Sequence, residues 1–452
     1  MLTVNRLKAI SGKVELPPSS DLFLVAAFAA LASCRTARIH PIGKGAEIRK
    51  WAALLSGHAA VTLEGDACLI ERANGGAPGT ITFANDQLPY RDLVLFLALG
   101  AGKRIVFATI PEKRLEAWRA TGRRLGVELA PVQEGALQGL VCAQVNSATP
   151  PPREIEERDI NAGLGFFFGL RAKRIFRTSF TLSNPFRHCA ACFGGAIEVK
   201  RDTGEREKDP LLRRIRLQTG QRLSEQEQSF LVTTDFSLPP PTGEPVDIEL
   251  PGDEALLALF CTAKSLVQRG SLVIDNAPLE PWALPIIQFL RKMGCKPSLQ
   301  EMRRTSFGAA GMLSLSRFDL SGQKIDFAPQ HPAAMQLPAM AMVAAFAENQ
   351  SLFRQFEDLR RSDPDGIRQL ESCLKTMSVK FGDIPDGFVI KGEKEYDGFD
   401  LIEPLPAPCA GAFTMAGLRC IGSTTVNDER IIERWPDFYE MIMNVGEVRS
   451  QQ

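Results

Sequence analysis

The feature that most constrains the fold is the run from Leu22 to Ala32, which is apolar on every side. Leu and Ala favour a helix, and Ser20 or Asp21 can cap its first turn by accepting from free backbone N–H groups. A helix without a polar face must be buried all round. The run is also far too short to cross a bilayer. It therefore predicts a helix inside a protein core.

The same pattern of a polar turn followed by an apolar helix recurs along the chain. It returns at residues 85–99, 161–170, 251–260, 329–347 and 406–417. β-prone pieces follow, such as those at 104–107 and 271–274, and then come amphipathic helices that we expect to end at Gly126, Gly194, Gly294 and Gly446. Three such units lie on each side of a stiff Pro/Gly hinge at 237–245. Repetition of this kind predicts two similar α/β lobes.

Composition excludes several classes of protein. The chain of 452 residues has zero formal net charge and no long basic run, so we expect no nucleic-acid partner. Its ten cysteines are scattered, which is typical of a reduced, cytoplasmic protein, and no membrane-spanning or targeting segment is visible. Cys189 and Cys192 have no second pair of matching spacing, so no metal site is expected. The charged stretch 200–228 is too polar to pack and predicts a surface excursion or mobile loop.

The direction of the apolar helices has an electrostatic consequence. If the helices of each lobe run the same way, their N-termini converge on the cleft between the lobes. Free N–H groups and aligned peptide dipoles make such a convergence an anion site. We therefore expect a small phosphorylated or carboxylated ligand, enclosed when the lobes close.

Five short motifs are spread over the chain. They are Gly12–Ser20, Pro251–Asp253, Asp358–Asp363, Asp386–Gly392 and Arg434–Phe438. Together they resemble motifs of the enolpyruvyl transferase family, which includes EPSP synthases. The resemblance implies a two-lobed fold (an inside-out α/β barrel), with three βαβαββ units in each lobe and the N-terminal strand packed into the second lobe. On this basis the first lobe would cover 21–238, and the second would cover 1–20 and 239–452.

The chemistry implied by this resemblance is carboxyvinyl transfer from phosphoenolpyruvate to a hydroxyl group, without a cofactor. The reaction needs cations to hold phosphate and carboxylate groups, and it needs acid/base groups to move protons. The candidate acid/base residues are Asp363 and Asp326. The candidate anion- or substrate-binding residues are Ser19, Ser20, Asn85, Arg114, Asp253, His331 and Arg360. Three of these have structural alternatives: Asp253 and His331 as helix caps, and Arg360 as a salt-bridge partner.

The departures from the family pattern are numerous. The family Lys is missing between Ser19 and Ser20, the N-A-G-T loop has become 85–88, and the D-H-R triplet has become 406–408. The K-E pair has become 362–363, and the terminal Lys has become Glu433 or Arg434. We therefore expect a divergent relative that does not synthesise EPSP. Two possibilities stay open: a transferase with another anionic acceptor, or an inactive relative that binds a ligand or a protein partner.

Overall fold

The computed structural model describes most of the chain. The described residues are 1–71, 79–85, 88–145, 154–178, 184–201, 230–238, 243–315, 317–326, 331–356, 359–360 and 364–448. Most of the charged stretch predicted at 200–228 lies outside them, as do residues 239–242 of the predicted hinge. The chain divides into two compact units. Unit 1 comprises Met1–Ser20, Pro41–Lys50 and Leu250–Gln452, and unit 2 comprises Asp21–His40 and Trp51–Glu249.

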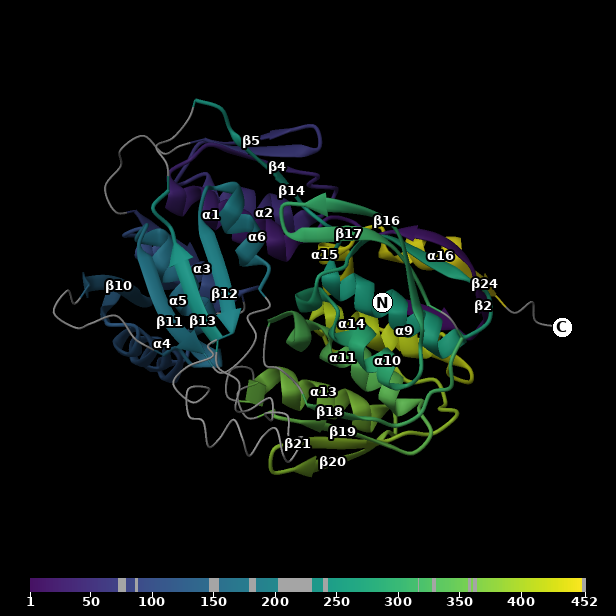
Figure 1. Ribbon diagram of the computed structural model, residues 1–452. Helices are drawn as coiled ribbons and strands as arrows, with labels where there is room; N and C mark the ends of the chain where they lie inside the picture. Colours follow the sequence, from purple (N-terminus) through teal and green to yellow (C-terminus); the bar gives the residue numbers. More distant parts are fainter. Residues whose placement is uncertain are drawn as a thin grey trace, which may run out of the picture. The chain divides into compact units, whose positions relative to one another are not determined.

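The six apolar segments all form helices, as the sequence predicted (Figure 1). They are α1 (Ser20–Ser33), α3 (Arg91–Gly100), α5 (Ile160–Gly169), α9 (Glu254–Val267), α11 (His331–Ala345) and α14 (Ala407–Gly417). Burial follows from composition: Leu22 to Ala30 of α1 are each at most 1% exposed. None of the helices in the described part of the chain has the length and hydropathy that a membrane span requires.

Unit 1 is a mixed α/β body whose sheets draw on both ends of the chain. Its other helices are η3 (Pro281–Ala283), α10 (Pro285–Lys292), α13 (Pro364–Thr376), α15 (Glu429–Arg434) and α16 (Phe438–Val445). Its strands are β1 (Leu2–Asn5), β2 (Leu7–Ile10), β3 (Gly12–Glu15), β15 (Leu272–Pro278), β16 (Pro297–Thr305), β17 (Gly308–Leu315), β18 (Lys324–Asp326), β19 (Gln350–Arg354), β20 (Lys380–Ile384), β21 (Gly387–Lys391), β22 (Asp400–Leu401), β23 (Ser423–Val426) and β24 (Gly446–Val448).

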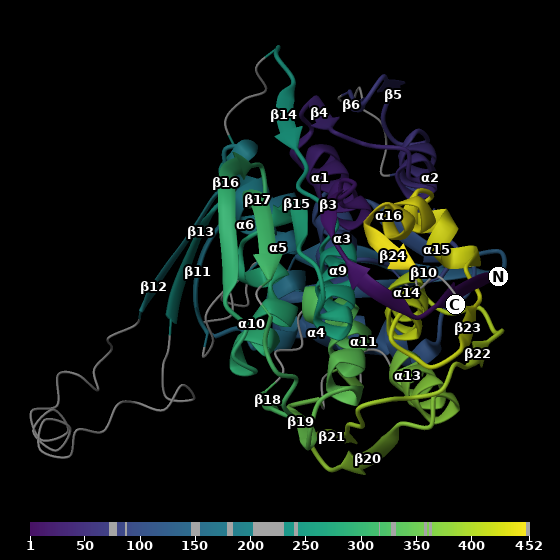
Figure 2. The ribbon, with the colours of Figure 1, turned by 90° about the vertical axis from the view of Figure 1, so that its right-hand side faces the viewer.

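The described strands of unit 1 form four sheets, in the orders β1-β23-β22, β16-β17-β15-β3, β18-β19-β21-β20 and β2-β24. The first three strands of the chain thus pair with strands from its second half (Figure 2). β1 runs antiparallel to β23, with Leu2 opposite Val426, and β3 runs parallel to β15, with Val14 opposite Ile274. The turn after β3 is therefore held beside the start of α9.

The three buried helices of unit 1 are parallel. Thr262 in α9 donates its hydroxyl hydrogen bond to the carbonyl of Ala339 in α11. Gly411 near the start of α14 faces Leu259 of α9, and Arg419 just after α14 donates to the carbonyl of Leu266 near the end of α9. The N-termini of α9, α11 and α14 consequently lie at one end of the unit.

Unit 2 is also a mixed α/β body. Its further helices are α2 (Ala46–Leu55, whose first residues belong to unit 1), α4 (Glu112–Arg124), η1 (Glu157–Asp159) and α6 (Phe186–Cys192). Its strands are β4 (Ala37–His40), β5 (Val61–Glu64), β6 (Ala67–Ile70), β7 (Thr80–Phe83), β8 (Arg104–Phe107), β9 (Val127–Glu134), β10 (Leu137–Val145), β11 (Lys173–Thr178), β12 (Ala196–Arg201), β13 (Phe230–Asp235) and β14 (Val246–Glu249). The described strands form sheets in the orders β14-β4-β6-β5, β7-β8-β10-β9 and β11-β13-β12.

Helices α3 and α5 of unit 2 touch backbone to backbone. A Cβ atom on Gly165 would lie 2.5 Å from the carbonyl oxygen of Leu93, and one on Gly169 would lie 2.7 Å from that of Leu97. Side chains larger than hydrogen would push the two helices apart. The order of these contacts along both helices shows that α3 and α5 are parallel.

The four amphipathic helices end at the predicted glycines, and three of these glycines have the left-handed conformation typical of a helix end. Gly126, Gly194 and Gly294 have φ values of 78°, 88° and 92°, in the left-handed region. Gly446 is extended instead, with φ −94° and ψ 126°. The difference has a tertiary cause, because Gly446 begins β24 and pairs with Ile10 of β2.

Candidate functional site

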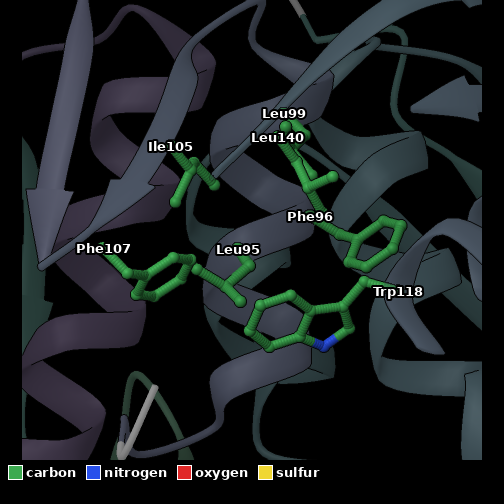
Figure 3. A pocket seen from close by; sticks show the side chains of 7 residues that line it. All are labelled: Leu95, Phe96, Leu99, Ile105, Phe107, Trp118 and Leu140. Carbon is green, nitrogen blue, oxygen red and sulfur yellow. The ribbon is translucent and has the colours of Figure 1, made fainter. Parts of the chain in front are cut away.

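An apolar cavity lies inside unit 2, but its lining does not suit a polar ligand. Figure 3 shows side chains from α3, β8, α4 and β10 pointing toward one another around it; they are Leu95, Phe96, Leu99, Ile105, Phe107, Trp118 and Leu140. The indole nitrogen of Trp118, the one polar side-chain atom among them, donates to Asp92 Oδ1 at 2.9 Å. We interpret this cavity as a small packing gap in the core.

A polar cluster in unit 1 brings together three of the residues that the sequence indicated. Ser19 and Ser20 end the turn after β3, and Asp253 precedes α9. The two turns are tied by backbone hydrogen bonds, from the Ser19 N–H to the Pro251 carbonyl and from the Asp253 N–H to the Pro17 carbonyl. Three further charged residues complete this opening-turn cluster, which we define as Ser19, Ser20, Glu47, Asp253, Glu254 and Arg434.

Both serine hydroxyls of the cluster donate to carboxylates of the same chain. Ser19 Oγ donates to Glu254 Oε2 at 2.8 Å, in a fully buried position. Ser20 Oγ donates to Glu47 Oε2 at 2.9 Å. Because a hydroxyl has a single proton to donate, neither group has a donor left for an external anion while these bonds exist.

Asp253 serves as a helix cap and as an ion-pair partner. Its Oδ1 accepts from the N–H groups of Ala255 and Leu256 at 2.9 Å each, in the first turn of α9. Its Oδ2 accepts from Arg434 Nη2 at 3.0 Å. The Asp253 side chain is 1% exposed, and that of Arg434 is 7% exposed. The contacts of Asp253 are therefore those of a helix cap, the structural alternative to an anion-binding role.

Arg434 lies between carboxylates. Besides Asp253, its Nη1 lies 3.7 Å from Glu47 Oε2, and its guanidinium carbon lies 5.2 Å from the ring centre of Trp435. Two negative charges beside one positive charge leave a net negative cluster even before Glu254 is counted. An incoming anion would meet repulsion at this position rather than attraction.

The described helix starts of unit 1 offer few free N–H groups. Asp253 already caps α9. Helix α14 begins with Pro406 at its N-cap and Pro408 in its first turn, and proline has no N–H to donate. For α11 the preceding residues 327–330 and the side chain of His331 lie outside the described residues, so the predicted role of His331 stays a prediction.

A backbone anchor holds the opening turn in place. Asn276 in β15 has a φ of 56°, at the position where the pairing of β15 with β17 is irregular. Its Nδ2 donates to the Leu16 carbonyl at 3.0 Å, and its Oδ1 accepts from Arg303 at 2.6 Å. Asn tolerates the left-handed conformation better than most residues. Irregular strand pairing of this kind is common beside functional sites.

The neighbouring Asp275 forms an ion pair with Lys13 of β3, with Nζ and Oδ2 2.8 Å apart. Partial burial pushes the pKa of the Asp275 carboxyl upward. The hydrogen bonds from Lys13 and from the Asn276 N–H, with the nearby positive charges, outweigh this effect, so the pKa lies below its ordinary value. The same hydrogen bond raises the pKa of Lys13.

The acid/base candidates and Arg360 are not part of the opening-turn cluster. Asp326 is exposed at the end of β18, opposite Arg354 of β19. Arg360 donates to Asp383 and to the Gly387 carbonyl, which matches its salt-bridge alternative. Asp363 lies outside the described residues. Within the part of the chain that the structure describes, neither Asp326 nor Arg360 has a hydrogen bond or ion pair to the cluster.

In unit 2, Arg91 at the start of α3 (Arg91–Gly100) packs over Trp118 of α4. The guanidinium of Arg91 lies 5.8 Å from the Trp118 ring centre, and Arg114 lies one turn before Trp118 on the same face of α4. Tyr90 precedes α3 with a φ of 45°, and no described side chain caps the helix. Asn85 is exposed, next to residues 86–87, which lie outside the description. The helix N-terminus and Arg91 favour an anion, and the Asp92 carboxylate, 3.4 Å from Arg91 Nε, offsets part of that positive charge.

Metal ligands do not gather anywhere in the described residues, where no three His, Cys, Asp or Glu side chains are placed to hold an ion. Cys189 and Cys192 lie on α6, with the Cys192 thiol donating to the His188 carbonyl. Burial raises the pKa of the Cys189 thiol well above its ordinary value, which disfavours the thiolate form that metals need.

Comparison with known proteins places these observations in a family. A model of the family "EPSP synthase (3-phosphoshikimate 1-carboxyvinyltransferase)" matches residues 224–442. A 3-phosphoshikimate 1-carboxyvinyltransferase of Koribacter versatilis is 27% identical over 203 residues, which are 45% of this chain and 48% of the relative. One from Carboxydothermus hydrogenoformans is 25% identical over 201 residues, which are 44% and 46% of the two chains. The match thus spans about half the length of these relatives.

Solved structures are similar over nearly the whole chain. EPSP synthase from Acinetobacter baumannii aligns with a TM-score of 0.64 at 16% identity, covering 98% of both chains. The enolpyruvyl transferase NikO from Streptomyces tendae aligns with a TM-score of 0.65 at 14% identity, covering 98% of this chain and 97% of that one. At these identities the likeness concerns the fold, which is a mixed α/β fold. With the family match over the second half, it follows that the chain is a distant member of the EPSP synthase/enolpyruvyl transferase family.

Proposed function

We propose that this protein binds a small phosphorylated or carboxylated metabolite and does not synthesise EPSP. The observation that carries the proposal is the state of the opening-turn cluster. Ser19 and Ser20 donate to Glu254 and Glu47, and Arg434 is paired with Asp253. Two anionic substrates would need these donors, and the carboxylates already hold them. The missing family Lys leaves no further cation in this turn.

We infer that the anion contacts unit 2 through Arg114. Trp118, four residues after Arg114 on α4, packs under Arg91 at the start of α3, and Arg91 is itself paired with Asp92 at 3.4 Å. The ring of Trp118 gives Arg91 an apolar support, with the guanidinium carbon 5.8 Å from the ring centre.

We also infer the finer architecture that the sequence predicted: a first lobe of residues 21–238 and a second of 1–20 and 239–452, each with three βαβαββ units. Support comes from the three sheets described in unit 2 and from the three larger sheets described in unit 1. Each of these sheets accompanies one of the six buried helices along the chain.

A turnover assay tests the negative half of the proposal. The purified protein is incubated with phosphoenolpyruvate and shikimate 3-phosphate, and phosphate release is measured. We expect no release above the protein-free control. Turnover of about 1 to 1,000 per second, the ordinary range of enzymes, would overturn the proposal.

A binding assay tests the positive half. A panel of phosphorylated and carboxylated metabolites is screened by thermal shift, and the affinity of a hit is measured by calorimetry. Arg114→Ala should weaken binding about 10- to 100-fold, the usual effect of losing a charged hydrogen bond. Arg123→Ala, an exposed arginine on the same helix, is the matched control and should bind like the wild type. Equal affinities for both variants would contradict the role of Arg114.

A second candidate is an inactive relative that binds a protein partner. The observation that favours it is a group of large apolar side chains exposed on α15 and α16: Ile432, Tyr439 and Met443, which are 53%, 49% and 52% exposed. Tyr439 and Met443 are four residues apart and share one face of α16. A metabolite panel without hits, combined with a co-purifying chain that Tyr439→Ser releases, would favour this candidate.

A further inference from the structure

Strand β12 (Ala196–Arg201) forms a regular edge of a sheet in unit 2. Among the described strands it pairs only with β13, and the strands lie in the order β11-β13-β12 (Figure 1). The pairing with β13 extends over all six residues without a shift in register. Along the outer side of such a strand, backbone N–H and C=O groups are directed away from the sheet and can pair with a further strand.

The corresponding edges of four other sheets carry features that oppose such pairing. Strand β5 has only four residues, and β9 contains Pro131. The pairing of β16 is irregular between Gln300 and Arg303, and β20 contains Gly382. Short strands, prolines and bulges are usual means of preventing edge-to-edge association, and glycine weakens a strand. Strand β12 has none of these features, so it is the most suitable of the five edges for a further strand.

The charged side chains of β12 match those of a second copy. Glu198 and Lys200 share the outer face of the strand, with side chains 63% and 75% exposed and Lys200 Nζ 3.2 Å from Glu198 Oε2. A lone lysine on an edge would oppose pairing by its charge. Two opposite charges on either side of Val199 have the reverse effect. If Val199 faces the Val199 of a second, antiparallel copy, each Glu198 faces a Lys200 across the two strands.

Val199 supplies an apolar contact at the centre of this arrangement. It lies on the inner face of the sheet, opposite the fully buried Val232 of β13. Val199 itself is only partly buried, because no described strand covers its outer side. A second copy would bring a β-branched side chain against it, and such cross-strand pairs stabilise a sheet.

We propose that two copies of this chain associate by antiparallel pairing of their β12 edges, about a two-fold axis at Val199. The two β11-β13-β12 sheets then form one continuous sheet, and no covalent bond changes. The paired segment, from Ile197 to Arg201 in each copy, is short, so the dimer is weak and depends on protein concentration. The association does not rest on the ligand proposed for Arg114, and each proposal can fail without the other.

The test is charge reversal followed by mixing. Sedimentation velocity of the full chain is measured at about 5 to 500 µM protein, a range suited to a small interface, and at about 50 mM salt, where screening is weak. The sedimentation coefficient of the wild type should rise with concentration. Glu198→Lys and Lys200→Glu each create two like-charge pairs, so either variant should raise the dimer Kd about 10-fold or more. An equimolar mixture of the two variants places opposite charges at both positions again and should associate like the wild type.

Two controls complete the experiment. Lys173→Glu reverses an exposed lysine of β11, which is paired with Asp235 at 3.0 Å on the opposite edge of the same sheet, and it should dimerise like the wild type. The double variant Glu198→Lys with Lys200→Glu exchanges the two charges within one chain and should also dimerise. Circular dichroism verifies that each variant is folded, as expected for changes at exposed side chains.

Three results would each overturn the proposal. The first is a wild type that stays monomeric at every concentration, as it would if the edge were covered within one chain. The second is a dimer that neither Glu198→Lys nor Lys200→Glu weakens, which would place the contact elsewhere. The third is a mixture of these two variants that does not associate, because the antiparallel register about Val199 requires that it does.

Discussion

The buried pair of Asp253 and Arg434 gives the sharpest prediction about stability. Asp253→Asn keeps an oxygen that can cap α9, since Asn and Asp are equally good N-cap residues. It removes the negative charge next to Arg434, which is 3.0 Å away and almost completely buried. Asp253→Ala removes both the charge and the cap. The two variants therefore separate the ion pair from the helix cap.

The magnitudes follow from the contacts. A hydrogen bond to a buried charged group contributes about 1.5–3 kcal/mol, and Glu47 at 3.7 Å compensates only part of the loss. We therefore expect Asp253→Asn to lower the free energy of unfolding by about 2–3 kcal/mol. Asp253→Ala should cost about 1 kcal/mol more, for the two N–H groups left without an acceptor. The total agrees with the roughly 3–5 kcal/mol typical of a broken buried ion pair.

Urea unfolding followed by circular dichroism and by tryptophan fluorescence measures these differences. Trp435 is a suitable reporter because it lies beside Arg434 and stacks on Phe438. In a double-mutant cycle with Arg434→Met, the coupling energy of the pair should be about 2 kcal/mol. An Asp253→Asn protein within about 0.5 kcal/mol of the wild type would refute this account of the cluster.

Two further predictions concern other parts of the fold. Gly165→Ala should lower the free energy of unfolding by about 1–3 kcal/mol, because its new methyl group would meet the Leu93 backbone. Gly163→Ala on the same helix is the control: its new methyl group would meet only the ends of flexible side chains, so thermal unfolding should show little change or a small gain. The lowered pKa of Asp275 means that the Lys13–Asp275 pair stabilises the fold above about pH 4, the ordinary Asp range, and that this contribution is lost as the pH falls through the lower folded-state value. The difference in melting temperature between the wild type and Asp275→Asn should accordingly be constant near neutral pH and shrink below about pH 4; a constant difference down to acid pH would contradict the shift.

Several features of the fold could be predicted from local sequence. The all-apolar runs predicted buried helices because a helix without a polar face has no stable place at the surface, and α1 and α9 are examples. The glycine at 126 predicted a helix end because only glycine takes the left-handed conformation without cost. The helix also ends at Gly446, but there pairing with Ile10 makes the glycine extended rather than left-handed. Pairing with a strand from the other end of the chain thus overrides the preference of glycine for the left-handed conformation at a helix end.

The candidate site could be predicted only in part. The sequence identified Ser19, Ser20 and Asp253, but reasoning from sequence missed Glu47 and Glu254. A signal for Glu254 was present, since a glutamate that opens an otherwise apolar helix needs a partner when it is buried. Glu47 carried no such signal, because it opens an amphipathic surface helix where acids are common.

The sequence by itself determined which segments are buried and which family the chain resembles, since both depend on the order of residues within short windows. Only the tertiary structure decided which charges face each other. Ser19 meets Glu254 across 235 positions of sequence, and Arg434 meets Asp253 across 181. Whether a hydroxyl or a guanidinium is available to a ligand depends on those distant partners, because a hydrogen-bond donor can be used only once. Burial is a property of a segment, whereas the availability of a donor is a property of the folded chain.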